Sequence, residues 1–189
     1  MTVFEDFLSY NVLVRYKNEY YYGKEKESEE RREGGKPKLC CEILRFQAHW
    51  GLKQLGNEDG NLFHKLVDAE VNFIAELDLA QDMLAIKSLI DGVKQSFKAT
   101  PTLEKGDFVK SPTAVALGIA SVEDINNIGI PLTWNEMIAQ KILTIYYPEE
   151  YRNQIIDWAK ANGYCSSTYL GRPMVKFSKL YIIIDRTRT

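Results

Sequence analysis

TWNEMIAQKILTIYYPEEYRNQIIDWAKANG, residues 133–163, and RPMVKFSKLYIII, residues 172–184, are the two stretches that decide the fold. The first begins with the spacing of a capping box, in which the Thr133 hydroxyl and the Glu136 carboxylate bind the first free amides of a helix. Proline cannot continue a helix without a kink, so Pro148 ends or bends this one. We therefore predict a helix from Thr133 to about Pro148.

A second helix and a basic hairpin are expected to follow. Asn162-Gly163 is a typical helix end, because glycine and asparagine tolerate the left-handed conformation found there. The predicted buried stripes comprise, in the first helix, Trp134, Met137, Ile138, Ile142 and Ile145, and, in the second, Tyr151, Ile155, Trp158 and Ala159. Residues 131–189 are thus predicted to form a helix–helix–hairpin subregion.

The final strand changes character along its length. Val175 and Phe177 alternate with Lys176 and Ser178, which is the pattern of a strand with one face in solvent. Leu180–Ile184 is apolar on both faces instead. This end is predicted to be buried on both sides, as in the covered centre of a sheet.

Apolar residues recur with helical spacing through residues 39–98, which are predicted to form a helical bundle core. A loop is expected at Asn57–Gly60, and Asp78 is expected to cap the helix that follows it, which divides the region into three helices. The expected apolar stripes are Leu39, Ile43, Phe46 and Trp50; Leu62, Phe63, Leu66, Val67, Glu70, Phe73, Ile74 and Leu77; and Leu79, Met83, Ile86, Ile90, Val93 and Phe97.

The N-terminal residues allow two interpretations. β-branched and aromatic residues at 12–16 and 19–22 flank a short polar turn, which favours a hairpin. The competing interpretation is one long helix, because Val3, Phe7 and Val14 also share a helical face with Tyr10. The predicted fold class is α+β, mainly α: a helical bundle with a small antiparallel β element formed by the C-terminal strand and, where it forms, the N-terminal hairpin.

Composition points to one globular domain over residues 1–189, with 45% hydrophobic and 26% charged residues. Residues 24–38 carry basic and acidic side chains in near balance, and they are predicted to be a charged linker or exposed loop. The formal net charge of −2 gives no bulk attraction to nucleic acid, so any such binding requires a local basic patch.

No apolar run approaches the roughly 20 residues that a membrane span needs, and the N-terminus does not resemble a signal peptide. We therefore predict a cytoplasmic protein without membrane contact. Three cysteines, two of them adjacent, make a poor disulfide framework, so free thiols are expected. Neither a metal site nor a cofactor is predicted, because the sequence contains no Cys-x-x-Cys pair and no glycine-rich nucleotide-binding loop.

Catalytic chemistry has only weak support in the sequence. His64 and Asp68 lie four residues apart on a predicted helix and could share a proton or a metal. Cys40 precedes a helix body, where a thiol pKa is lowered. A small hydrolase or transferase with a site around His64, Asp68 and Cys40 is therefore one alternative, although no assembled catalytic motif supports it.

The basic residues of the C-terminal third are the main functional candidates. With tyrosines interleaved, they could contact phosphates and stack bases. The predicted nucleic-acid-binding residues are Arg172, Lys176, Lys179, Arg186 and Arg188. The favoured function is a non-enzymatic binding or accessory protein that contacts nucleic acid or a nucleoprotein complex. A protein–protein adaptor subunit of a larger assembly is the other alternative, and its expected sign is an exposed apolar patch.

Overall fold

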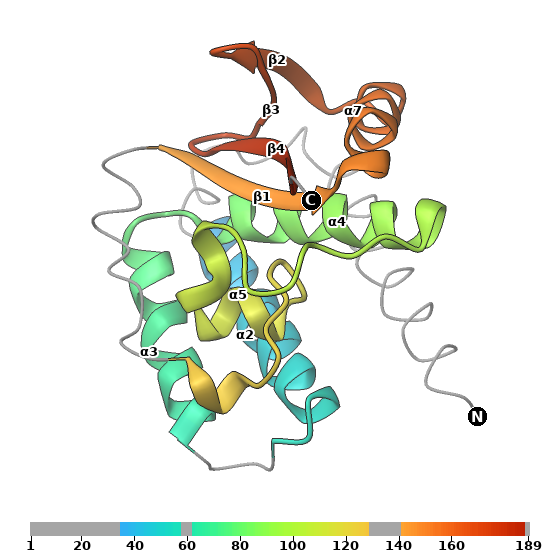
Figure 1. The fold of residues 1–189 in the computed structure, drawn as a ribbon. Coiled ribbons are helices and arrows are strands. Elements are labelled where there is room, and N and C mark those ends of the chain that lie inside the picture. Colours follow the sequence, from blue (N-terminus) through green and yellow to red (C-terminus); the bar gives the residue numbers. More distant parts are fainter. Residues whose placement is uncertain (1–34, 58–61, 129–140, 188–189) are drawn as a thin grey trace, which may run out of the picture. The chain divides into compact units, whose positions relative to one another are not determined.

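The computed structural model describes residues 35–57, 62–128 and 141–187, nearly all of which belong to one compact unit, Pro37–Thr189. Within these residues the fold is α+β and mainly α, as predicted (Figure 1). The helices are α2 (Gly35–Gln54), α3 (Leu62–Glu76), α4 (Ala80–Phe97), α5 (Pro112–Ala116) and α7 (Arg152–Ala161). The strands are β1 (Ile142–Pro148), β2 (Cys165–Tyr169), β3 (Arg172–Lys176) and β4 (Tyr181–Thr187).

The four strands form one mixed sheet in the order β1-β4-β3-β2. β1 and β4 are parallel, with Ile145 opposite Ile184, whereas β3 is antiparallel to both β4 and β2. The prediction of a purely antiparallel element is therefore wrong for β1, which joins the sheet through a crossover that contains α7. The proposed N-terminal hairpin lies outside the described residues, so its pairing with the last strand stays a prediction.

β1 occupies part of the segment predicted to be a helix, so the prediction of a helix reaching Pro148 is wrong for Ile142 onward. Residues 142–147 are rich in β-branched and aromatic side chains, which favour a strand. Their burial alternates along β1: Leu143, Ile145 and Tyr147 are buried, and the residues between them are partly exposed. The capping box at Thr133 and the side chain of Trp134 lie outside the described residues.

The final strand is also divided in two. β3 ends at Lys176, and a turn through residues 177–180 reverses the chain into β4. Ile182, Ile183 and Ile184 are all at most 3% exposed, which confirms that this end is buried on both faces. β4 lies between β1 and β3, so it is covered along both edges as well.

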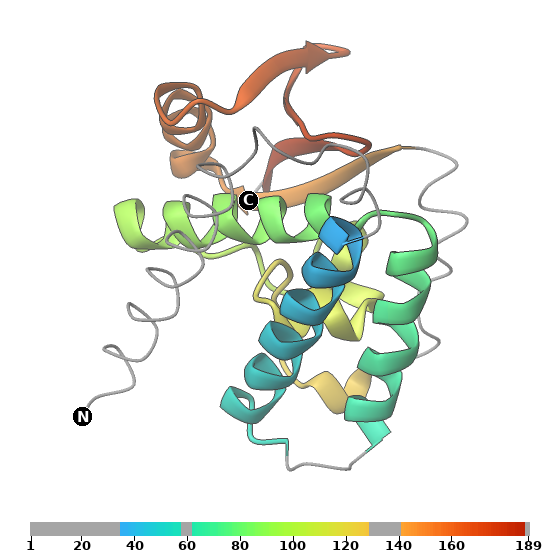
Figure 2. The same ribbon diagram turned by 180° about the vertical axis from the view of Figure 1, so that it is seen from behind.

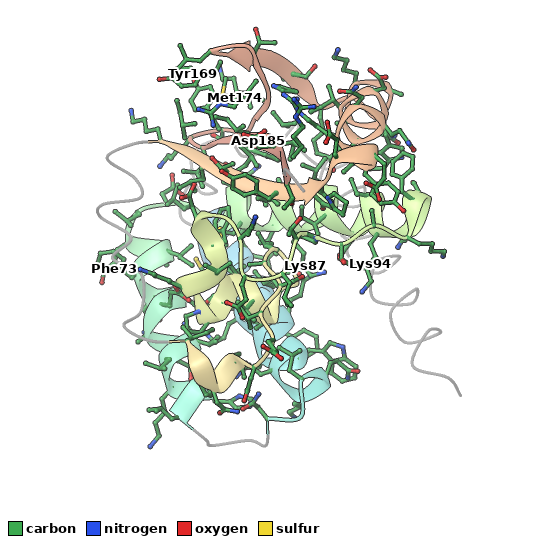
Figure 3. The ribbon with its side chains drawn as sticks, in the orientation of Figure 1. Phe73, Lys87, Lys94, Tyr169, Met174 and Asp185 are labelled. Atoms are coloured by element: carbon green, nitrogen blue, oxygen red, sulfur yellow. The ribbon has the colours of Figure 1, made fainter. Side chains whose placement is uncertain are left out.

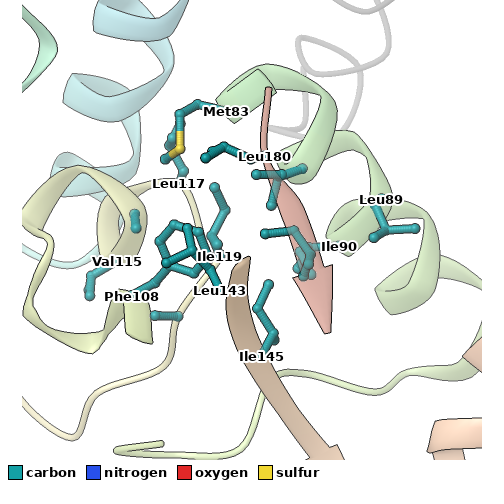
Figure 4. Close-up of a cluster of buried hydrophobic side chains, with 14 of the residues drawn as sticks. Met83, Leu89, Ile90, Phe108, Val115, Leu117, Ile119, Leu143, Ile145 and Leu180 are labelled. Carbon is teal, nitrogen blue, oxygen red and sulfur yellow. The ribbon is translucent and has the colours of Figure 1, made fainter. Parts of the chain in front are cut away.

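The core lies between the sheet and the helices. α4 runs beneath β1 and β4 and crosses the adjacent ends of α2 and α3 (Figures 1 and 2). Side chains of α4, the 3₁₀ turn Asp107–Lys110, α5 and β1 interdigitate there, among them Met83, Phe108 and Ile145 (Figure 4). The predicted stripe of α4 is confirmed, since Met83, Ile86, Ile90 and Val93 are at most 2% exposed.

The predicted stripe of α2 is wrong. Leu44, Ala48 and Leu52 are fully buried, whereas Leu39 and Trp50 are 40% and 41% exposed. The small residues of α2 face its neighbours: a Cβ atom on Gly51 would lie 1.7 Å from the carbonyl oxygen of Ala116. Helical spacing alone could not choose between the two faces, because each carries apolar residues.

The edge of β1 that does not face β4 is covered by the loop before α5. Thr102 donates its backbone N–H to the carbonyl of Tyr146 at 2.7 Å, and Thr144 donates its N–H to the Asp107 carboxylate at 2.6 Å. Gly106 allows this close approach, because it has a φ of +104° and a Cβ atom there would lie 2.7 Å from the carbonyl oxygen of Thr144. The loop thus protects an otherwise open strand edge.

Burial of Tyr147 predicts a stability change at alkaline pH. Its hydroxyl is buried without a hydrogen-bond partner, and burial, with a smaller effect of Asp91, raises the pKa of Tyr147 well above the ordinary value of 10.0. A group whose pKa is raised by folding stabilises the protein at pH values below its ordinary pKa, and this stabilisation is lost as the pH rises above that value. Tyr147→Phe should raise the free energy of unfolding by about 1 kcal/mol at neutral pH. The variant should also lose less free energy of unfolding between pH 8 and pH 11, as measured by urea unfolding. An equal loss in the variant and in the unchanged protein would contradict the assignment of this loss to Tyr147.

Candidate functional site

The predicted nucleic-acid-binding residues fall into two groups at opposite ends of β4. Lys179, in the turn that precedes β4, forms an ion pair with Asp78 at 2.7 Å. Lys176 lies 5.8 Å from the centre of the Tyr181 ring at the start of β4. Arg172 and Arg186 lie near the other end. Arg188 lies outside the described residues. The basic side chains therefore do not form one continuous row.

The second group lines a pocket of about 610 Å³. Its lining comes from four segments of the chain: the loop beside β1, the β1–α7 junction, the β2–β3 turn and the end of β4. The lining residues are Lys105, Tyr146, Arg152, Leu170, Arg172, Asp185, Arg186 and Thr187. We call this the basic pocket. Its volume lies within the range of about 300–1,000 Å³ typical of small-molecule sites.

The parallel strands bring these segments together. β1 and β4 run in the same direction, so Tyr146 lies opposite Asp185 and both strands end beside the pocket. Pro148 and the following 3₁₀ turn end β1, and Arg152 then opens α7. The hairpin turn at Leu170-Gly171 returns the chain so that Arg172 comes back to β4, where Figure 3 shows Asp185 between β1 and the hairpin. Carboxyl ends of parallel strands are where open α/β sheets commonly bind ligands.

Carboxylates hold two of the four cations in place. Arg172 contacts Asp185 Oδ2 through Nη1 at 3.3 Å, and Asp185 Oδ1 accepts the backbone N–H of Arg186 at 2.8 Å. Arg186 forms an ion pair with Glu149. Asp185 is the single carboxylate of the lining, and both its oxygens are engaged. The negative charge of Asp185 is therefore balanced locally, and the lining keeps an excess of positive charge.

The other two cations have no carboxylate partner among the residues that the structure describes. Among the residues described, neither Lys105 nor Arg152 forms an ion pair with a carboxylate. The Nε atom of Arg152 is buried and makes no hydrogen bond. A buried donor without a partner is costly. Arg152 also lines the pocket, where a bound anion would balance the charge of its guanidinium group. Neither Lys105, which lies in an irregular loop, nor Arg152 is among the binding residues predicted from the sequence.

The residues considered for catalysis are only partly brought together. His49 Nδ1 lies 2.6 Å from His64 Nδ1, and His49 Nε2 lies 2.8 Å from Asp68 Oδ1, which makes a chain of two imidazoles and a carboxylate between α2 and α3. The two rings stack, with centroids 4.8 Å apart. His64 is only 5% exposed, and neither this pair nor Asp68 lines the basic pocket. We interpret this chain as a contact that fixes the packing of α2 on α3.

Cys40 is distant from this chain. It lies nine positions before His49 on α2, which corresponds to about 13 Å along the helix axis. Burial, with the nearby Cys41 and Asp78, raises the pKa of Cys40, which is the opposite of the lowered pKa expected from the sequence. Cys40, Cys41 and Cys165 are free thiols. Within residues 35–57, 62–128 and 141–187, no group of three or more His, Cys, Asp or Glu side chains is placed to hold a metal ion.

Comparison of the chain with protein-family models, with curated proteins and with solved structures finds no match. No described helix has both the length and the hydrophobicity that a membrane-spanning segment requires. The described residues form an α+β fold that is mainly α, with a basic pocket at the carboxyl ends of two parallel strands.

Proposed function

We propose that the protein is a non-enzymatic accessory protein of the cytoplasm that binds nucleic acid through its phosphates, with the basic pocket as the contact site. The observation that carries the proposal is the convergence of four cations from separate segments on one concavity: Lys105, Arg152, Arg172 and Arg186. Guanidinium groups suit phosphate because their fork of N–H donors matches its oxygens. A concave site also focuses the electrostatic field, which lets a protein of net charge −2 attract an anion locally.

The proposed contact residues differ in part from those predicted from the sequence. Arg172 and Arg186 keep their proposed role, and Lys105 and Arg152 are added to them. Lys179 is engaged with Asp78, so we propose a structural role for it. The proposed contact site is a single pocket of about 610 Å³, which suits an accessory contact better than the coating of a long strand.

Binding should depend on Arg152 more than on a lysine elsewhere on the same helix. We expect Arg152→Gln to weaken binding to single-stranded DNA and RNA irrespective of sequence. We also expect it to reduce the slope of log K against log salt by about 0.7, the value for one phosphate contact on a single strand. Fluorescence anisotropy of labelled oligonucleotides at several low salt concentrations measures both quantities.

Lys160→Gln is the matched control, because Lys160 is exposed on α7 and lies outside the basic pocket. Equal weakening by the two variants would contradict the proposed site. Absence of binding to every oligonucleotide would contradict the function and would favour the protein–protein adaptor. For that alternative the supporting observation is the exposure of Leu39, Phe46 and Trp50 on α2, which are each at least 40% exposed.

A further inference from the structure

We infer that the basic pocket recognises the terminal phosphate monoester of a nucleic-acid strand in preference to the phosphodiesters within it. This inference rests on the proposed function and names the part of the nucleic acid that the pocket would take. Three features of the basic pocket support this inference. They are the clustering of its cations, the number of N–H donors in its lining, and the uncharged residues of the lining.

The cations are clustered and not arranged in a track. Binding along a strand needs a groove of positive charge that follows successive phosphates. Lys176 and Lys179, which could have extended such a groove along β4, lie at the opposite end of β4, next to Tyr181 and Asp78. Lys105, Arg152, Arg172 and Arg186 are instead gathered around one concavity, which suits one concentrated charge.

A phosphate monoester matches this site better than a diester does. A monoester carries a charge of about −1.5 to −2 at pH 7 and three strong acceptor oxygens, whereas each phosphodiester of a strand carries one negative charge. Arg152 and Lys105 have no carboxylate partner in the described part of the chain, and Arg172 keeps N–H donors besides the one that contacts Asp185. Arg152, Lys105 and Arg172 come from three segments that all line the pocket, so a dianion bound there would lie among several positive charges.

The remaining lining offers contacts for the terminal nucleotide. Tyr146 provides an aromatic ring, Leu170 an apolar side chain that is 78% exposed, and Thr187 a hydroxyl that lies 2.7 Å from the hydroxyl of Thr102. Rings of this kind stack on bases of any sequence. A volume of about 610 Å³ accommodates a ligand of nucleotide size.

The test compares one single-stranded oligonucleotide in three forms: with a 5′-phosphate, with a 3′-phosphate and with hydroxyls at both ends. Anisotropy titrations should show one phosphorylated form binding about tenfold tighter than the hydroxyl form, the difference expected for a charge-assisted contact. This preference should fall to within about twofold in Arg152→Gln and persist in Lys160→Gln. Lys105→Gln is the second pocket variant, and circular dichroism verifies that each variant is folded.

The outcomes separate this inference from the proposed function. If the three forms bind equally while Arg152→Gln weakens all of them, the strand-end preference is wrong and the nucleic-acid function stands. If no oligonucleotide binds, both are wrong. Competition by a nucleoside monophosphate distinguishes the source of the phosphate: displacement of the phosphorylated oligonucleotide at comparable concentration would overturn strand-end recognition in favour of a free nucleotide, and weak competition supports the strand end.

Discussion

Asp82→Ala should lower the free energy of unfolding by about 3–5 kcal/mol. Asp82 lies in the first turn of α4 and is 3% exposed. Its carboxylate accepts three backbone N–H groups from the turn between β3 and β4: those of Ser178, Lys179 and Leu180, at 3.2, 2.7 and 2.8 Å. Alanine would remove all three bonds and leave the buried N–H of Leu180 without an acceptor, which is why the expected effect is large.

Urea unfolding followed by far-ultraviolet circular dichroism measures this effect. Asp82→Asn should give an intermediate loss, because the amide oxygen can still accept but carries no charge. Asp91→Ala is the matched control on the same helix: Asp91 pairs with Lys87 within one turn of α4, and such pairs contribute at most about 1 kcal/mol. A loss for Asp82→Ala no larger than that for Asp91→Ala would show that the turn is held by other contacts.

Gly51→Ala should destabilise the protein by about 2–3 kcal/mol, although alanine favours a helix by about 1 kcal/mol over glycine. The added Cβ atom would lie 1.7 Å from the carbonyl oxygen of Ala116 and 2.6 Å from its carbonyl carbon. Both atoms belong to the backbone, so α2 or the end of α5 must move to relieve the clash. Thermal and urea unfolding of the variant measure the loss.

Gly92→Ala provides the comparison for Gly51→Ala. There the new Cβ atom would lie 2.2 Å from the outer edge of the Trp158 ring, which belongs to a side chain and can shift. We expect the smaller loss for Gly92→Ala. The reverse order would mean that α2 tolerates displacement more readily than the indole of α7, contrary to the backbone contact described for Gly51.

Local patterns predicted the helices of residues 39–97 because helical hydrogen bonds join residues that are close in sequence. The regular spacing from Leu79 to Val93 left only one face to bury, and α4 buries it. Residues 142–148 behave differently. Ile142 and Ile145 fit a helical stripe as well as a strand, and the decision comes from hydrogen bonding to residues 181–187, far along the chain. A short apolar run without that partner is ambiguous.

The basic pocket could be predicted only in part for the same reason. Arg172 and Arg186 stood out because they flank a strand rich in isoleucine. Lys105 lies at the pocket because its neighbours Thr102 and Asp107 form hydrogen bonds with the backbone of β1. No local sequence pattern predicts these contacts. The sequence also gave equal weight to Lys176 and Lys179, since the partner of Lys179, Asp78, lies about a hundred residues earlier.

The central place of β4 determines when the sheet can form during synthesis. β1, β2 and β3 all leave the ribosome before β4, yet β1 has no described hydrogen-bonded neighbour in the sheet other than β4. At about 5–20 residues per second, the nascent chain must leave the β4-facing edge of β1 unpaired for seconds. Until β4 emerges, Leu143 and Ile145 lack their cross-strand partners, so this interval is when a nascent chain would most need a chaperone.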